Sequence, residues 1–404
     1  MVNRRRGLCA ALLAAVVAAT AGCGTGDSAA PARPEVDLAK LDVGNLNAEP
    51  KYYDKPTSLD MARLVEAMRL GNHLPLPMEI DPEVKYAPTK MGAVRLFTSM
   101  SSGAISTRIN GEAAALDARI SGFVTGFVTA GRTDTTRNLS WELDNVAMLF
   151  ETEQDAKRAA DAFTEVERGF LGDKAPPQTI PGFPEARAHL LTDSHGWINS
   201  YYPVGKFVLL TQVRDNIMQE LDVTDAEKLR TRVARSIEKM RPALESFTPT
   251  PVGELMQLDV DPERMLALPL NTVADPGQLG IPGVYDRHGG LQIGFNPDAD
   301  SKMFESAGVD AVAWKGGYVY RTRDAVAAAK LVDRRAKVGK FYRRAAAPPN
   351  LPFAQCLQYV GPAEGTVYYC GVSFGRYAAE VTAGQLQDVH QRISAQYAIL
   401  ARAK

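Results

Sequence analysis

The chain has 404 residues, four of them cysteine, and its 46 Lys and Arg residues nearly balance 47 Asp and Glu residues, which gives a formal charge of −1. This length predicts two or three domains, because a domain usually holds about 100 to 200 residues. An apolar share of 45% argues against general disorder. The near-neutral charge gives no sign of the basic domain or stripe that binds nucleic-acid phosphates, so we expect no nucleic-acid partner.

The first 22 residues have the features of an export signal. Three arginines at positions 4 to 6 precede an uncharged apolar run from Leu8 to Ala21, which is too short to cross a bilayer as a helix. The run ends in small residues before Cys23, as in a bacterial lipobox, although Thr20 stands where Leu is usual. We therefore predict a signal peptide over 1–22 and a lipidated flexible spacer over 23–35, with ordinary secretion or an uncleaved anchor as alternatives.

Lipidation of Cys23 would tether the protein to the extracytoplasmic face of the cell membrane. Cys9 would leave with the signal, so Cys356 and Cys370 would remain. An isolated cysteine pair in an oxidising compartment predicts one structural disulfide. A redox or metal pair is the alternative, but the spacing fits neither a C-x-x-C oxidoreductase nor a zinc site.

From Val36 the chain becomes globular in character. The first half predicts these elements in order: a helix capped by Ser58 and reaching about Leu70, an irregular connection over 74–88, strands over 94–98, 120–129 and 146–150, a helix over 153–170, a proline loop over 181–184, a strand over 205–213 and a helix with an apolar stripe from Leu229 to Leu244.

The second half repeats the later part of this order. It predicts a strand over 318–322, a helix from Asp324, a proline loop over 349–352, a strand opening over 375–378 and a last helix from Leu386 to Leu400. The pairs Asp155 and Asp324, Pro181 and Pro349, and Gly205 and Gly375 keep a separation of 168 to 170 residues. This constant offset indicates a duplicated module of about 170 residues.

The order of elements predicts an α+β fold in both modules. We expect an antiparallel or mixed sheet with helices packed on one face, in a ferredoxin-like split βαβ arrangement. The N-terminal domain is expected over 36–248 and the C-terminal domain, which holds the disulfide, over 252–404, because the boundary falls at a Thr-Pro-Thr-Pro segment.

The motif over 371–375 matches the G-x-S-x-G pattern of serine hydrolases, with Asp388 and His390 downstream of Ser373. A nucleophile elbow needs a strand, a tight turn and a helix, whereas a second strand is expected here, so we predict no catalytic residue. Asn296, Asp298 and Asp300 alternate as in a calcium loop, but the required Gly and the final Glu are missing. We expect Asp300 or Ser301 to cap a helix that ends at Gly308. The sequence predicts no metal site and no cofactor.

One charged surface stands out in the sequence. A helix is expected to continue from Asp324 through residue 344, with an apolar stripe on one side. Its other side carries five basic residues: Lys330, Arg334, Lys337, Lys340 and Arg344. We interpret this side as a solvated helix face or, alternatively, as a surface for anionic envelope groups such as lipid phosphate or acidic glycan.

Several segments together resemble the uncharacterised two-domain lipoproteins of mycobacteria and nocardiae: the lipobox, residues 41–44 (LDVG), 304–310 (FESAGVD), 320–324 (YRTRD), the two late cysteines, and 388–392 (DVHQR) with 395–398 (AQYA). The similarity covers nearly the whole mature chain. It implies an envelope-anchored protein and transfers no functional residues.

We expect a non-enzymatic ligand-binding or protein-interaction module of the cell envelope, with a groove between the two domains for a lipid, glycan or protein partner. The alternatives are an envelope hydrolase that acts on lipid or glycan, and a purely structural envelope partner.

Overall fold

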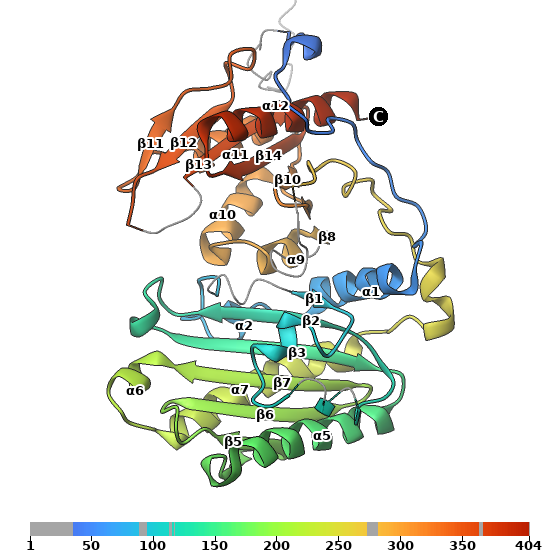
Figure 1. Ribbon diagram of the computed structural model, residues 1–404, viewed down its shortest axis with the longest axis vertical. Helices are drawn as coiled ribbons and strands as arrows, with labels where there is room; N and C mark the ends of the chain where they lie inside the picture. The colour runs from blue at the N-terminus through green and yellow to red at the C-terminus, as the bar shows by residue number, and fades with distance from the viewer. Residues whose placement is uncertain are drawn as a thin grey trace, which may run out of the picture.

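The computed structural model describes residues 35–88, 95–112, 115–116, 118–272, 282–362 and 367–403. Cys23, the expected signal peptide and the spacer up to residue 34 lie outside these ranges. Within them, no helix is both long and apolar enough to cross a membrane. The two domains are stacked along the long axis of the molecule (Figure 1).

The N-terminal domain is built on a seven-stranded sheet in the order β1-β2-β3-β7-β6-β5-β4. Its strands are β1 (Leu96–Phe97), β2 (Phe123–Arg132), β3 (Trp141–Phe150), β4 (Pro177–Ile180), β5 (Phe183–Leu190), β6 (Trp197–Val204) and β7 (Phe207–Asp215). Its α-helices are α1 (Leu59–His73), α2 (Pro77–Ile80), α3 (Gly103–Ser106), α5 (Glu153–Leu171), α6 (Asn216–Glu220) and α7 (Ala226–Ser246). Short 3-10 turns are η1 (Leu38–Lys40), η3 (Arg137–Leu139), η4 (Gly172–Lys174) and η5 (Val252–Gln257).

The C-terminal domain has a second seven-stranded sheet in the order β11-β12-β13-β14-β10-β9-β8. Its strands are β8 (Gly283–Asp286), β9 (Ala311–Trp314), β10 (Tyr318–Arg321), β11 (Tyr342–Ala345), β12 (Gln355–Tyr359), β13 (Tyr368–Phe374) and β14 (Tyr377–Ala383). Its helices are α9 (Arg287–Gln292), α10 (Pro297–Ala307), α11 (Ala325–Arg335) and α12 (Leu386–Arg402).

The two sheets have the same topology. When the strands of each sheet are numbered along the chain, both sheets read 1-2-3-7-6-5-4 from one edge to the other. In both domains a helix follows the third strand and another follows the seventh. Gly205 and Gly375 occupy equivalent two-residue turns before the seventh strand, each with a φ of +52°, a backbone conformation that favours glycine. The expected α+β fold with two related modules is confirmed, and the shared topology supports duplication.

The finer expectation of a ferredoxin-like arrangement is not confirmed. Every pair of neighbouring strands in the described parts of the two sheets is antiparallel. In a split βαβ unit, a helix joins two parallel strands that have a single antiparallel strand between them, whereas here three strands lie between β3 and β4 and between β10 and β11. Here the helix after the third strand leads instead to the far edge of the sheet, and the chain returns strand by strand to the centre.

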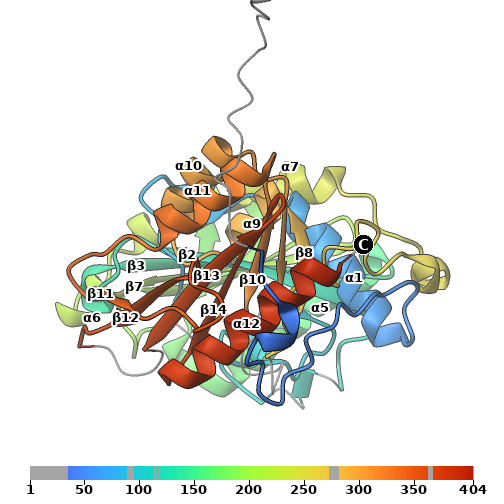
Figure 2. The same cartoon turned by 90° about the horizontal axis from the view of Figure 1, so that it is seen from above.

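The expectation that helices cover one face of each sheet is wrong, because both faces are covered. In the N-terminal sheet, Val146 of β3 packs in one apolar cluster with Phe163 of α5, whereas Ala147 packs in another with Val233 of α7. In the C-terminal sheet, α12 covers one face, and α10 and α11 cover the other (Figure 2). Accordingly, β3 is buried along its whole length and lacks the alternation of a half-solvated strand.

The first described segment packs on the C-terminal domain, although the sequence places it beside the N-terminal one. Leu41 and Ala48 are buried in the core of the C-terminal sheet. The side-chain amide of Asn350 donates to the Lys40 carbonyl at 2.5 Å, and Arg402 donates to the Ala48 carbonyl at 2.8 Å. Figure 1 shows this blue segment beside α12, from where it runs down to α1. The segment therefore links the two domains, because it packs on the C-terminal domain and then continues into α1 of the N-terminal domain.

Helix α1 fills much of the boundary between the domains, where a groove was expected. Gly71 of α1 lies against the Phe127 ring of β2, while the Val284 amide of β8 donates to the Met68 sulfur at 3.3 Å. Gln292 of α9 donates to the Leu74 carbonyl at 2.9 Å. A surface cavity of about 350 Å³ opens at the rim of this boundary, lined by Arg69, Asn72, His73, Ser246, Phe247, Thr248 and Asp286.

Candidate functional site

The G-x-S-x-G motif does not form a nucleophile elbow. Ser373 is buried within β13, opposite Ala378, and Gly375 turns the chain directly into β14. Asp388 accepts from Arg392 at 2.8 Å, whereas Nε2 of His390 donates to the Ala346 carbonyl at 2.7 Å. The expected second strand is present, so the chain after Ser373 forms a strand-to-strand turn and not the start of a helix.

The calcium-like segment is a helix start. The side chain of Asn296 accepts from the Ala299 amide at 3.1 Å, so α10 begins at Pro297 and not after Asp300 or Ser301 as expected. The expected end is confirmed, because Gly308 closes the helix in the left-handed conformation. Asp300 is instead buried and accepts from Arg335 at 2.9 Å.

The predicted disulfide is present between Cys356 and Cys370. The two cysteines lie directly opposite each other on β12 and β13, with their Cα atoms 4.2 Å apart. This short spacing is typical of a non-hydrogen-bonded pair in an antiparallel ladder. Both side chains are buried in the core of the C-terminal domain, which indicates a structural role.

The five predicted basic residues do not share one helix face. Helix α11 ends at Arg335, so Lys330 and Arg334 lie on the helix, Lys337 and Lys340 on the following connection, and Arg344 on β11. All five are exposed. Arg334 donates to the Ser306 hydroxyl and Arg344 to the Gln355 side chain at 2.6 Å. The apolar spacing had suggested a longer helix, but Gly339 and the β-branched and aromatic residues beside it favour an end.

Sequence reasoning missed Arg335, because it lies on the buried side of α11. Its guanidinium is 3.0 Å from a Glu380 carboxylate oxygen and lies over the Tyr320 ring. Burial alone would lower the pKa of Arg335, but the neighbouring Glu380, Tyr320 and Asp300 outweigh it and hold the pKa above the ordinary value. Together with the bond to Asp300, these contacts join α10, α11 and β14, which is a structural role.

A second polar cluster is buried between α5 and the N-terminal sheet. Glu167 accepts from the Tyr201 hydroxyl at 2.7 Å and from the Asn110 amide at 2.6 Å, and it lies 3.0 Å from His189. Burial raises the pKa of Glu167, but the hydrogen bonds from His189, Tyr201 and Asn110 outweigh it and lower the pKa overall. Glu167, His189 and Tyr201 are fully buried, so this cluster faces no solvent-accessible site.

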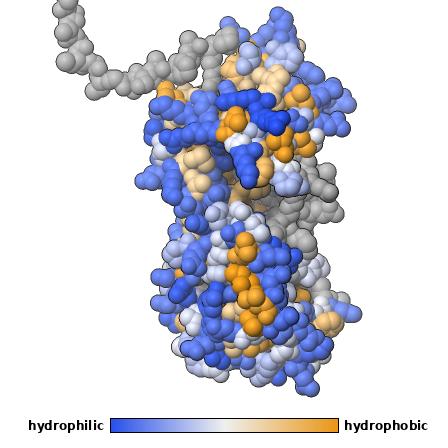
Figure 3. All heavy atoms as spheres, turned by 90° about the vertical axis from the view of Figure 1, so that its left-hand side faces the viewer, coloured by the Kyte–Doolittle hydropathy of each residue, from blue (hydrophilic) through white to orange (hydrophobic). Residues whose placement is uncertain are grey.

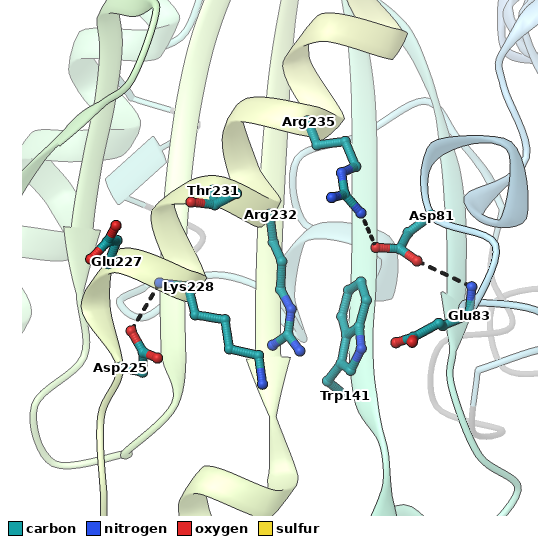
Figure 4. Close-up of a pocket in the computed structure, with 9 residues that line it drawn as sticks. All are labelled: Asp81, Glu83, Trp141, Asp225, Glu227, Lys228, Thr231, Arg232 and Arg235. Carbon is teal, nitrogen blue, oxygen red and sulfur yellow. Dashed lines mark hydrogen bonds and ion pairs between the residues drawn. The ribbon is translucent and has the colours of Figure 1, made fainter.

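A cavity of about 460 Å³ opens on the surface of the N-terminal domain beside α7 (Figure 4). We call it the Trp141 cavity. It is lined by Asp81, Glu83, Trp141, Asp225, Glu227, Lys228, Thr231, Arg232 and Arg235. These residues come from the α2–β1 connection, the start of β3 and the first turns of α7, so three segments far apart in the sequence meet here.

Helix α7 presents its cations to the cavity at regular spacing. The Asp225 carboxylate accepts from the Lys228 amide at 2.9 Å and caps the helix. Lys228, Arg232 and Arg235 then follow at intervals of four and three residues, which places them on one face. Arg235 pairs with Asp81 at 2.5 Å, and Figure 4 shows both side chains beside Trp141.

Trp141 forms the floor of this cavity. The Arg232 guanidinium lies 4.0 Å from the centre of the Trp141 ring and donates to Asp215 at 2.7 Å. Trp141 is only 4% exposed, and its indole N–H has no hydrogen-bond partner among the described residues. By contrast, the indole N–H of Trp197, which lies under Arg214, donates to Asn199 at 3.0 Å. An unpartnered buried donor costs about 1–3 kcal/mol, so it stands out at a cavity wall.

An exposed apolar surface adjoins the cavity. It consists of Leu139, Ile217, Leu221 and Val223 on η3, α6 and the following turn, with Leu139 63% and Leu221 66% exposed. We call it the α6 patch. Asp215 links it to the cavity, because one carboxylate oxygen accepts from the Ile217 amide while the other accepts from Arg232. An exposed apolar stripe is visible on the N-terminal domain from the side at which α6 lies (Figure 3).

Each of the two domains matches a known family model. The N-terminal model of a domain of unknown function, DUF7373, matches residues 53–260, and its C-terminal model matches residues 264–403. No curated protein and no solved structure matches the chain. The two matches cover most of the chain and confirm the expected two-domain family of unknown function. The chain therefore belongs to the DUF7373 family.

Proposed function

We propose that this chain is an extracytoplasmic lipoprotein of the cell envelope, tethered through Cys23, that binds a partner polypeptide without catalysis at the Trp141 cavity and the α6 patch. The tether rests on the export signal and the lipobox. The binding site rests on one observation above all, the unpartnered indole N–H of a buried tryptophan at the wall of a charged surface cavity.

The composition of the site favours a polypeptide ligand. The cavity holds both signs of charge, because its lining includes Lys228 and Arg235 as well as Glu83 and Glu227, so it offers donors and acceptors to a peptide backbone and to polar side chains. The adjoining α6 patch offers apolar area for a partner's apolar side chains. Tryptophan and arginine in a desolvated setting are the residues that carry most of the binding energy at protein interfaces.

The site is also held in place before binding. Arg232 is fixed by Asp215 and by the Trp141 ring, and Arg235 is fixed by Asp81. Asp215 is itself buried and caps α6, so the same carboxylate positions the patch and the cavity. Groups ordered before the ligand arrives lose less entropy on binding, which favours recognition.

The proposal is tested by photo-crosslinking in the native envelope. A photoreactive amino acid at Thr231, which lines the cavity, is expected to capture a discrete polypeptide. The same amino acid at Lys157, which is exposed on α5, is the control position. Trp141→Phe, which removes the N–H donor together with part of the ring, and Leu221→Glu, which charges the patch, should each reduce the adduct about tenfold. Trp197→Phe should leave the adduct intact, because that indole N–H already has a partner within the chain.

Several outcomes would count against this function. An equal adduct at Lys157, a glycan or lipid adduct in place of a polypeptide, or an adduct unchanged by both Trp141→Phe and Leu221→Glu would each overturn it. The tether is tested separately by mass spectrometry of the mature N-terminus, where an unmodified residue other than Cys23 would refute lipidation.

A further inference from the structure

The connection between α11 and β11 carries exposed apolar and basic side chains together. Val338 is 56% exposed, Phe341 38% and Val360 41%. Val360 is part of the same surface, because its amide donates to the Phe341 carbonyl at 2.8 Å. We call this surface the β11 tip: Lys337, Val338, Lys340, Phe341, Arg343 and Val360.

The charge around the β11 tip is strongly one-sided. Residues 330–344 hold seven Lys and Arg residues and a single acid, Asp333, in a chain whose overall charge is −1. Lys337, Lys340 and Arg343 are exposed and have no ion-pair partner within the described ranges. The Lys340 ammonium lies 5.1 Å over the Phe341 ring, so apolar and cationic groups are intermixed. Lys and Phe intermixed in this way are typical of surfaces at the lipid headgroup level.

The N-terminal domain provides an internal comparison. Strand β4 occupies the position in its sheet that β11 occupies in the second sheet, at the edge opposite β1 and β8. The connection before β4 is the short turn η4, and its one lysine, Lys174, is paired with Asp193. The shared topology therefore does not require a basic and apolar connection at this position, which is a property of the second domain alone.

Protection of a sheet edge explains only part of the β11 tip. Charged residues on an edge strand prevent strand pairing between molecules, and Arg343 on β11 fits that role. The same role disfavours exposed Val338, Phe341 and Val360 beside the edge, because apolar side chains there promote association. A surface that keeps both kinds of side chain exposed fits a partner with an apolar interior and an anionic border.

The route of the N-terminal segment brings a membrane within reach of the β11 tip. The described chain starts at Glu35 on the C-terminal domain, and Lys40 contacts Asn350 in the β11–β12 connection. Strand β11, four residues long, runs from residues 337–341 of the β11 tip to that connection, and its length is roughly 13 Å. Eleven residues lie between Cys23 and Glu35, and such a chain spans at most roughly 40 Å. A lipid on Cys23 can thus share one bilayer with the β11 tip.

We propose that the β11 tip docks on the anionic lipid surface of the membrane, with Val338, Phe341 and Val360 at headgroup level and the lysines on lipid phosphates. This second contact would orient the C-terminal domain at the membrane. The inference rests on the proposed lipid tether and is independent of the Trp141 cavity.

Vesicle flotation tests the proposal with the mature chain carrying Cys23→Ser, which has no lipid of its own. The wild-type surface is expected to bind vesicles of equal parts phosphatidylglycerol and phosphatidylcholine and not vesicles of phosphatidylcholine alone. Lys337→Glu/Lys340→Glu should weaken binding by about tenfold or more, since each basic residue near an anionic surface contributes severalfold. Lys157→Glu/Lys239→Glu, an equal charge change at exposed residues of α5 and α7, should leave binding unchanged.

Phe341→Ser separates lipid docking from simple attraction to a polyanion. It should weaken vesicle binding severalfold and leave any binding to soluble polyphosphate unchanged. No binding to anionic vesicles, equal losses in the two lysine pairs, or full vesicle binding by Phe341→Ser would overturn the proposal. Circular dichroism of every variant checks that the fold is retained. If vesicle binding persists but the Thr231 adduct is absent, the polypeptide site at the Trp141 cavity is refuted and lipid docking by the β11 tip is not.

Discussion

His288 Nε2 lies 3.0 Å from Glu79 Oε2, which places an ion pair across the boundary between the two domains. The hydrogen bond from Glu79 raises the pKa of His288 above its ordinary value, although burial opposes it. In Glu79, burial raises the pKa, but the hydrogen bonds from His288 and the Leu76 amide outweigh burial and lower it overall. The pair therefore favours the charged form of both groups.

The contact between the domains is expected to depend on pH. A raised histidine pKa gives stability that is complete below about 6.5 and is lost as pH rises through the folded pKa. A lowered glutamate pKa gives stability that is complete above about 4.5 and is lost as pH falls through the folded pKa. His288→Ala should thus cost most near pH 5.5, about 1 kcal/mol or less for a partly exposed pair, and less at pH 8.5. Urea unfolding at both pH values measures this, with His195→Ala, whose ring contacts a threonine hydroxyl, as control.

Asp215→Ala should destabilise the N-terminal domain by about 3 kcal/mol, because it leaves the Arg232 guanidinium without its buried partner and removes the cap of α6. Asp193→Ala, which breaks an exposed pair with Lys174, should cost less than about 1 kcal/mol. Tryptophan fluorescence during chemical unfolding reports both. Equal small losses in the two variants would refute the role given to Asp215.

Replacing both cysteines by serine, Cys356→Ser/Cys370→Ser, should lower the stability of the C-terminal domain by about 3 kcal/mol, because a closed loop of about 15 residues constrains the unfolded chain. Thermal unfolding of the variant against the oxidised protein measures the loss. Free thiols on both cysteines in protein recovered from the envelope would contradict the disulfide.

Gly71→Ala should destabilise the protein although alanine is the better helix former. At an exposed helix position, replacing Gly by Ala would stabilise the helix by about 1 kcal/mol. At Gly71, however, a Cβ atom would lie 2.4 Å from the Phe127 ring, so α1 or the ring must shift. We expect a net loss of about 1–3 kcal/mol in thermal or chemical unfolding. Gly169→Ala on α5, where a Cβ meets nothing, should be neutral or stabilising.

Much of the local structure could be predicted from the sequence. Ser58 caps α1 as expected, α5 matches its predicted range within one residue at its end, and Gly308 ends α10. The offset between Gly205 and Gly375 identified the repeated module before any topology was known. These features depend on residues a few positions apart, through helical periodicity, capping and the backbone freedom of glycine.

The sequence by itself thus determined the α+β class, the repeat and the cysteine pair. Only the tertiary structure decided that helices cover both faces of each sheet, that Lys337 and Lys340 lie beyond the end of α11, and that residues 36–50 pack on the C-terminal domain. The same holds for the meeting of Asp81, Trp141 and Arg232 at one cavity. Such contacts join residues tens to hundreds of positions apart, and they follow from strand order and burial, which local spacing does not encode.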